Sequence, residues 1–374
     1  MAEIVILGAG MIGRAMALDL SKKHNIIATD ISEAALDSLK GSPNIKTLNL
    51  DVNDNKSLAA AINTADIVIS AVPGFLGLQT MTRVIELGKD LVDISFLPED
   101  VRFLDPLARE KGVTVVMDCG VAPGMPNFIA GYYNEIMVID EFEYMVGGLP
   151  IVRTFPFEYK APFSPCDVIE EYTRPARFVE NGKIVVKPAM SDPELVNFDK
   201  AGTLEAFNTD GLRSLIYTLG HVPFMKEKTL RYPGHIRMIQ ALKVAGFFET
   251  ETMEFDGNQV SPFDFTSRIL FDAWKLGPEE KEFTVMRIKI KGKENGNSRE
   301  VIYDLYDEYD TVEKISSMAR TTGFTATGTA EMILDGLFTE KGVYPPELVG
   351  KNRACFDYII SYLRERKIEY EITS

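Results

Sequence analysis

Residues 4–20 read IVILGAGMIGRAMALDL, and this stretch decides the fold. Four apolar residues predict a short strand, a glycine-rich turn follows, and an amphipathic helix begins. In such a turn Gly8 allows the sharp change of direction, Gly10 lets a pyrophosphate approach the backbone, and Gly13 lets the helix pack closely on the sheet. Met11 and Ile12 complete the loop, at a helix start that offers free N–H groups to phosphate. The stretch therefore predicts a dinucleotide-binding fold.

The end of the second predicted strand indicates which dinucleotide is bound. Asp30 follows Gly8 by 22 residues. A carboxylate there accepts hydrogen bonds from ribose hydroxyls and repels a 2′-phosphate, and no arginine follows in DISEAAL. We therefore predict NAD rather than NADP. Asp51, after the third strand, is a candidate for the adenine end, and a plain helix-capping role is its alternative.

Up to residue 122 short apolar strands alternate with amphipathic helices, which is typical of a parallel sheet covered on both faces. Because ligands lie at the carboxyl ends of such strands, Ala71, Val72 and Pro73 are expected to line the cofactor site. We assign residues 1–122 to a Rossmann NAD-binding domain. Its expected strands are Ile4–Leu7, Ile26–Ala28, Ile45–Leu48, Ile67–Ser70, Leu91–Ile94 and Val113–Met117.

Beyond residue 122 the pattern changes to longer, alternating strands. TVMRIKIKGK (284–293) places apolar and basic residues on opposite faces, and Asn295-Gly296 is a hairpin-turn sequence. We predict an inserted α+β substrate domain over residues 123–320, with an antiparallel sheet. Its strands over 284–308 are expected to pair across a two-fold axis in a homodimer. Residues 321–374 are expected to return to the Rossmann domain, as a loop and then a helix ending near Gly336.

Composition narrows the possible partners and compartment. The 374 residues carry a formal charge of −15, which disfavours nucleic acid and serves solubility or attracts a cationic substrate. No run of 18 apolar residues predicts a membrane span, and the N-terminal residues lack a secretory pattern. Three widely spaced cysteines, Cys119, Cys166 and Cys355, indicate neither a disulfide framework nor a metal site. A cytoplasmic protein with a small-molecule substrate is expected.

Polar residues at two strand ends are expected near the nicotinamide. Asp93 and Ser95 lie in LVDIS, and Asp118 lies in VVMDCG. Asp118 is a candidate proton acceptor, and capping the next helix or pairing with an arginine is its alternative. His235, at a predicted helix start, is a second candidate base, and a histidine without chemical role is its alternative.

The exit from the last Rossmann strand, DCGVAPG (118–124), is expected to face the substrate. Gly120, Pro123 and Gly124 break the strand, and the helix that follows could hold a carboxylate at its N-terminus. Cys119 is included in this candidate site, although a buried free cysteine is usually a small hydrophobic residue.

Motifs in a fixed order now resemble a known family. They are ILGAGMIGR, VDIS (92–95), DCGVAPGMPN (118–127), FEYKAPFSP (157–165), GTLEAFNTDGLRSL (202–215) and TLRYPGH (229–235). Together they resemble the saccharopine dehydrogenase-like family, and within it most closely the lysine 6-dehydrogenases. The resemblance implies NAD-dependent oxidative deamination of L-lysine at its 6-amino group to the semialdehyde. Saccharopine or carboxynorspermidine-type dehydrogenation of a secondary amine is one alternative, and a non-catalytic NAD sensor is another.

The resemblance also implies a set of substrate residues. Saccharopine-type enzymes carry an arginine in a stretch like N-R-D-S, which suits a second substrate carboxylate. This chain has Asn208-Thr209-Asp210-Gly211 there. An aspartate without that arginine suits a substrate ammonium better than a carboxylate. The nearby Arg213 weakens this distinction. Arg177 or the helix after Pro123 is expected to hold the substrate's α-carboxylate. The implied substrate residues are Tyr159, Lys160, Ser164, Arg177, Thr209 and Asp210.

Overall fold

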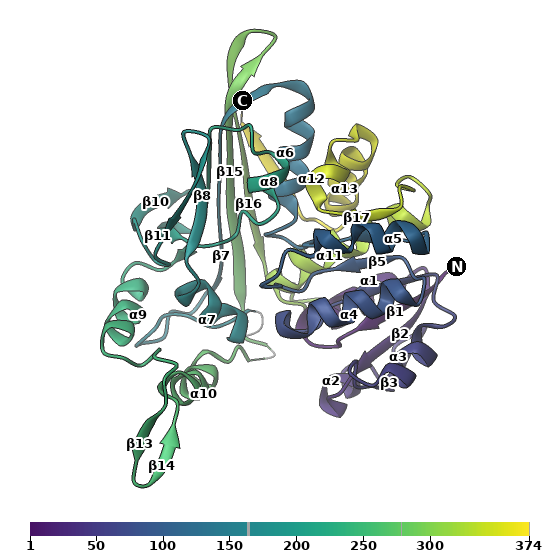
Figure 1. The fold of residues 1–374 in the computed structure, drawn as a ribbon, viewed down its shortest axis with the longest axis horizontal. Coiled ribbons are helices and arrows are strands. Elements are labelled where there is room, and N and C mark those ends of the chain that lie inside the picture. Colours follow the sequence, from purple (N-terminus) through teal and green to yellow (C-terminus); the bar gives the residue numbers. More distant parts are fainter. Residues whose placement is uncertain (163–164, 278, 374) are drawn as a thin grey trace.

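The computed structural model describes residues 1–162, 165–277 and 279–373, arranged as two lobes, each built on a sheet (Figure 1). The first sheet is parallel, in the order β17-β6-β5-β4-β1-β2-β3. It contains all six predicted Rossmann strands. The elements of the first lobe up to residue 116 are β1 (Glu3–Leu7), α1 (Met11–Leu20), β2 (Asn25–Asp30), α2 (Glu33–Asp37), β3 (Ile45–Asn49), α3 (Asn55–Ile62), β4 (Ile67–Ser70), α4 (Gly74–Glu86), β5 (Leu91–Asp93), α5 (Asp105–Lys111) and β6 (Thr114–Val116).

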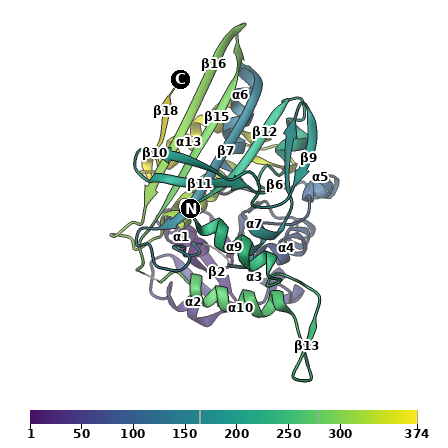
Figure 2. The same cartoon turned by 90° about the vertical axis from the view of Figure 1, so that its left-hand side faces the viewer.

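The second sheet follows the order β10-β11-β12-β7-β15-β16-β18, and β8 joins it at β12. Figure 2 shows the run from β12 to β18. It is antiparallel except between β7 and β12, so the predicted antiparallel sheet is a mixed one. The elements of this lobe are α6 (Met125–Ile136), β7 (Val138–Pro150), α7 (Pro165–Thr173), β8 (Ala176–Glu180), β9 (Lys183–Lys187), β10 (Glu194–Phe198), β11 (Gly202–Asn208), α8 (Leu215–Thr218), β12 (Phe224–Arg231), α9 (His235–Val244), β13 (Met253–Phe255), β14 (Asn258–Val260), α10 (Pro262–Trp274), β15 (Glu282–Glu294) and β16 (Asn297–Glu308).

The hairpin of β15 and β16 confirms the alternating pattern. Glu294 pairs with Asn297, so the turn consists of Asn295 and Gly296, whose φ angles are 51° and 82°. Two left-handed residues form a type I′ turn, whose twist matches that of the strands. Met286, Ile288 and Ile290 are buried on one face of β15.

Residues 317–373 contact both lobes. Helix α11 begins at Ser317, so the loop predicted at residue 321 is wrong: Ser316 caps a helix that starts earlier. Close packing on α1 favours this helix, because a Cβ added to Gly323 would lie 3.0 Å from Met16 Cγ. The elements are α11 (Ser317–Leu334), β17 (Gly342–Tyr344), α12 (Pro346–Gly350), α13 (Arg353–Glu365) and β18 (Tyr370–Thr373).

Strand β17 extends the Rossmann sheet beside β6, whereas β18 pairs with β16 of the second sheet. Part of the β16 edge is therefore covered by the chain's own C-terminal strand. The domain limits and the homodimer remain predictions. Among the helices of the described chain, none is both long and apolar enough to cross a membrane.

Candidate active site

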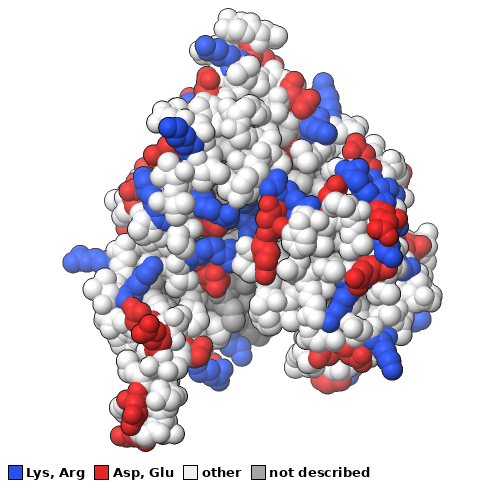
Figure 3. Space-filling model, viewed as in Figure 1, with Lys and Arg blue, Asp and Glu red and all other residues white. Residues whose placement is uncertain are grey.

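A cleft of about 720 Å³ follows the carboxyl edge of the parallel sheet and ends against β7 and β12 of the second lobe. Figure 3 shows a hollow between the lobes at the lower edge of one face. The cleft brings together most of the residues predicted to bind the cofactor. Those that line it are Gly8, Gly10, Met11, Ile12, Gly13, Asp30, Asp51, Ala71, Val72, Pro73 and Ser95, joined by Gly120 and Pro123 of the predicted substrate set.

The glycine turn has the geometry of a phosphate cradle. Gly8 has φ +99°, and a Cβ there would lie 2.6 Å from Ala71 O. A Cβ on Gly13 would lie 1.9 Å from Gly8 O, so the helix touches the turn directly. Nothing lies within 4 Å of a Cβ built on Gly10, and no side chain caps α1 at that residue. The open space and the free N–H groups of α1 fit a pyrophosphate.

Two aspartates occupy the other side of this turn. Asp30 accepts hydrogen bonds from Ala9 N at 2.7 Å and Ser32 N at 2.8 Å, which hold its carboxylate at the cleft. Asp51 accepts from Asn53 N at 2.9 Å. The cap of α3 is Asp54, so Asp51 is not the capping residue. Both aspartates line the cleft, and their contact with an adenosine remains a prediction.

Asp93 lies beneath the cleft rather than in its wall. It is fully buried and accepts from Ser95 N at 3.1 Å and Ser95 Oγ at 2.9 Å. Burial raises the pKa of Asp93 to about 7, against the opposing hydrogen bonds from Ser95. Asp93 therefore acts on the cleft through Ser95, whose side chain it orients.

Asp118 forms a buried ion pair. Its two carboxylate oxygens each lie 3.2 Å from a nitrogen of Arg213, and the two side chains are 0% and 4% exposed. Asp118 is absent from the cleft lining, and the arrangement matches the alternative of an arginine partner. Its role as proton acceptor remains a prediction.

The polar groups of the turn after Asp118 bond mainly to one another and to α11. Cys119 Sγ donates to Thr329 Oγ1 at 3.1 Å, and burial raises the pKa of its thiol to about 12. Gly124 has φ +140°, and a Cβ there would lie 1.8 Å from Gly120 O. Met125 N donates to Gly120 O, so this N–H at the start of α6 already has a partner. Gly120 and Pro123 reach the cleft, whereas Cys119 and Gly124 lie behind it.

His235 begins α9, as predicted, and is 1% exposed. Its Nδ1 donates to Phe157 O at 2.9 Å, so its Nε2 accepts from Tyr172 Oη at 3.0 Å. Burial and the nearby Arg231 lower the pKa of His235 to about 3, which keeps the imidazole neutral. The ring lies behind the cleft wall, and its role as a base remains a prediction.

Sequence reasoning missed the charged pair in the far wall of the cleft, Arg231 and Glu171. Arg231 Nη2 donates to Glu171, Nε donates to Tyr172 Oη at 2.9 Å, and the guanidinium carbon lies 4.4 Å from the Tyr159 ring centroid. The side chains are 2% and 18% exposed. Burial raises the pKa of Glu171, and Arg231 opposes this. The motif TLRYPGH contains Arg231 and could have singled it out, whereas no pattern marked Glu171.

Of the other residues implied by the resemblance, those that the structure describes lie outside the cleft lining. Tyr159 is buried against Arg231. Lys160 Nζ donates to the backbone oxygens of Ala273 and Lys275 at 3.3 and 3.2 Å. Ser164 falls outside the described residues. The structure thus places the side chains of Tyr159 and Lys160 outside the wall of the cleft.

Side chains of the N-T-D-G stretch (208–211) also pair with other residues of the second lobe. Arg177 forms two hydrogen bonds of 2.8 Å with Asp210. Thr209 Oγ1 donates to Glu227 at 2.7 Å. Glu227 is a further buried acid that sequence reasoning missed, and burial raises its pKa to about 8 against the hydrogen bond from Thr209.

Comparison with known families decides the identity of both lobes. Residues 4–116 match the saccharopine dehydrogenase NADP binding domain, and residues 120–368 match the saccharopine dehydrogenase C-terminal domain. The chain belongs to the saccharopine dehydrogenase family. The family's first domain is described as binding NADP, so the NAD preference drawn from Asp30 remains a prediction.

Relatives of this saccharopine dehydrogenase family member differ in length. It is 22% identical to the mouse mitochondrial alpha-aminoadipic semialdehyde synthase over 92% of this chain and 45% of that protein. It thus spans less than half the length of the semialdehyde synthases that it matches. The carboxyaminopropylagmatine dehydrogenase of Synechocystis is 24% identical over 93% of this chain and 92% of its own length. The Vibrio cholerae carboxynorspermidine synthase is 24% identical over 92% of each chain.

A solved structure shares the fold of this chain. The apo saccharopine dehydrogenase (L-Glu forming) from Saccharomyces cerevisiae superposes with a TM-score of 0.80 at 19% identity. The match covers 100% of this chain and 99% of that one. The likeness establishes the same two-lobed architecture for both proteins.

Proposed function

We propose that this protein is an NAD(P)-dependent oxidoreductase that acts on a C–N bond of an amino acid. One observation carries the proposal: a single cleft holds the phosphate cradle of Gly10 at one end and the Arg231–Glu171 pair at the other. A cofactor and a zwitterionic substrate would therefore meet inside one cavity. The names of the full-length relatives support the same reaction class.

The residues of the cleft fit a dinucleotide from one end to the other. Asp30 and Asp51 would hold the adenosine, Gly10 and the start of α1 the pyrophosphate, and Ser95 and Gly120 would face the nicotinamide. When bound, the nicotinamide supplies the hydride chemistry. The carboxylate of Asp30 supports NAD, because a 2′-phosphate would lie against its charge.

Arg231 and Glu171 would receive the substrate. A guanidinium with a planar fork of donors suits a carboxylate, so Arg231 would hold the α-carboxylate. Glu171 is the carboxylate at this end of the described cleft lining, and it can accept the proton that a substrate ammonium must lose before its carbon is oxidised. Burial, which raises the pKa of Glu171, brings this group closer to the operating pH of a base.

Two substrate classes suit this arrangement. The first is L-lysine oxidised at its 6-amino group, with water adding to the imine and ammonia leaving. The second is a secondary amine, as the names of the saccharopine and carboxynorspermidine relatives suggest. In the sequence, Asp210 favoured a substrate with an ammonium group. In the structure Asp210 pairs with Arg177 and does not line the cleft, so it does not distinguish between the two substrate classes.

A substrate panel tests the proposal. The protein is mixed with NAD or NADP and with L-lysine, ornithine, saccharopine or carboxynorspermidine, and reduced cofactor and ammonia are followed together. Reduced cofactor with equal ammonia from lysine supports oxidative deamination, whereas reduced cofactor without ammonia from a secondary amine supports the second class. Binding of NADH without turnover of any amine would leave the protein a dinucleotide sensor.

A further inference from the structure

Helix α11 brings Met318 and Thr322 into the cleft lining, and its first turn is held from the second sheet by Glu282. We propose that Glu282 is a positioning residue: by fixing the start of α11 it sets the space available at the nicotinamide end of the cleft. The inference rests on the proposed function, because it takes that end of the cleft as the nicotinamide site.

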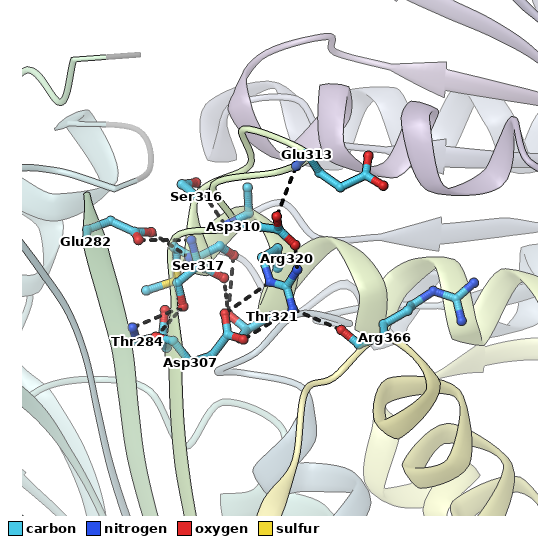
Figure 4. Close-up of polar contacts among 12 residues, drawn as sticks. Glu282, Thr284, Asp307, Asp310, Glu313, Ser316, Ser317, Arg320, Thr321 and Arg366 are labelled. Carbon is cyan, nitrogen blue, oxygen red and sulfur yellow. Dashed lines mark hydrogen bonds and ion pairs between the residues drawn. The ribbon is translucent and has the colours of Figure 1, made fainter. Parts of the chain in front are cut away.

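The contacts of Glu282 satisfy the helix start (Figure 4). The first N–H groups of a helix lack partners within it. Glu282, 1% exposed at the start of β15, accepts from Ser317 N at 2.9 Å and from Met318 N at 2.8 Å. Ser316 Oγ accepts from Ala319 N, and the first bond within the helix runs from Arg320 N to Ser316 O. The N–H groups of Ser317 and Met318 thus depend on a side chain of the other sheet, and a carboxylate there also stabilises the positive end of the helix dipole.

A wider network fixes the register between the sheet and the helix. Thr284 N of β15 donates to Ser317 Oγ at 3.1 Å, and Ser317 Oγ donates to Asp307 O of β16 at 2.8 Å. Arg320 pairs with Asp307 and donates to Asp310 Oδ2 at 2.7 Å. The first turn of α11 is therefore bound to both strands of the hairpin.

Two side chains of α11, Met318 in its first turn and Thr322 in its second, pack against glycines of the cleft lining. A Cβ built on Gly148 of β7 would lie 2.6 Å from Met318 Cε, and one built on Gly120 would lie 3.1 Å from Thr322 Cγ2. Gly148 and Gly120 have no side chains, and the side chains of Met318 and Thr322 occupy the space beside them. A displacement of the first turn would move Met318 into or out of the space beside Gly148.

The rest of α11 has a different anchor. Gly323 packs on α1, which begins at the phosphate cradle, and Thr327 Oγ1 donates to Asp19 of α1 at 2.9 Å. Loss of the Glu282 contacts would therefore release the first turn and leave the adenosine and pyrophosphate end unchanged. This difference makes the inference measurable with two ligands, NADH and ADP-ribose, which lacks the nicotinamide.

The test is calorimetric titration of wild type and Glu282→Gln with both ligands. An amide offers one acceptor where the carboxylate offers two, so one N–H of the first turn loses its partner. We expect NADH affinity to fall by about threefold to thirtyfold, the range for coupling through a packed element, and ADP-ribose affinity to stay the same. Asp19→Asn is the matched control: it also removes a buried carboxylate beside α11, and it should lower thermal stability while leaving both affinities unchanged.

The outcomes separate this inference from the proposed function. An unchanged ratio of NADH to ADP-ribose affinity in Glu282→Gln overturns the positioning role alone. A wild type that binds neither ligand overturns the proposed function, and this inference with it. If Glu282→Gln does not fold, Glu282→Asp replaces it: this variant keeps the charge but draws the carboxylate back by one methylene from Ser317 N and Met318 N. It should weaken NADH selectively, whereas an unchanged ratio would again overturn the role.

Discussion

Asp118 and Arg213 form an ion pair that is closed off from solvent, with Oδ1 and Nη2 3.2 Å apart and side-chain exposures of 0% and 4%. Arg213 also donates to Leu97 O and stacks its guanidinium on Phe96, a residue of the cleft lining. Asp118, which follows strand β6, is therefore bound to the second lobe. The pair joins the exit of the Rossmann sheet to the segment after β11.

Asp118→Asn is expected to destabilise the protein by about 3–5 kcal/mol, because removing one partner leaves the other charge buried and unpaired. Urea unfolding measures the loss. Asp357→Asn, in an exposed pair with Arg353, is the control and should cost less than about 1 kcal/mol. An Asp118→Asn protein with unchanged stability and no turnover would contradict this expectation and make Asp118 a reacting group.

Gly10→Ala is expected to fold normally and to lose dinucleotide affinity. The φ of Gly10 is −62°, which alanine adopts easily, and a Cβ meets nothing within 4 Å, so the methyl would enter the space of the pyrophosphate. We expect the NADH dissociation constant to rise at least about tenfold, which corresponds to about 1.4 kcal/mol. Titration with NADH and a thermal melt together check this. Gly13→Ala contrasts with it: its Cβ would overlap Gly8 O, so the melting temperature should fall.

Glu171→Gln is expected to lower kcat by about a hundredfold or more if this carboxylate takes the substrate proton. The amide still offers an oxygen to Arg231 but has no basic site. Glu170→Gln is the matched control, because Glu170 is the preceding residue of α7 and pairs with the partly exposed Arg174 instead. Steady-state rates with the active substrate of the panel decide: equal rates in Glu171→Gln and wild type would exclude Glu171 as the base.

The stability of the protein is expected to fall as the pH rises toward 8, and Glu227 contributes to this fall. Burial raises the pKa of Glu227 from 4.5 to about 8, so its contribution is fully present below pH 4.5 and is lost as the pH rises through 8. A single group of this kind changes the free energy of unfolding by about 1.4 kcal/mol per pH unit between its two pKa values. Glu227→Gln should remove this component. Urea unfolding at several pH values checks it, and parallel profiles of the two proteins would contradict it.

The Rossmann half was predictable because its signals are local. Gly8, Gly10 and Gly13 are each required by the steric limits of a single turn. The strands β1–β6 appear in the sequence as short apolar runs. Asp30 could be placed from its distance along the chain, since the end of β2 is adjacent to that turn in every such sheet. The hairpin turn at Asn295-Gly296 was predictable for the same reason, because two consecutive left-handed residues admit few alternatives.

The far end of the cleft was decided by tertiary structure. Arg231 on β12 and Glu171 on α7 are 60 residues apart, and only the packing of those elements brings them together. Asp118 and Arg213 are 95 residues apart, and that pairing places Asp118 outside the lining. The sequence by itself determined the cradle, because glycine conformation and strand-end chemistry act between near neighbours. The charges around the substrate end were settled by the fold alone, because buried charges need partners and only three-dimensional packing decides which partners they find.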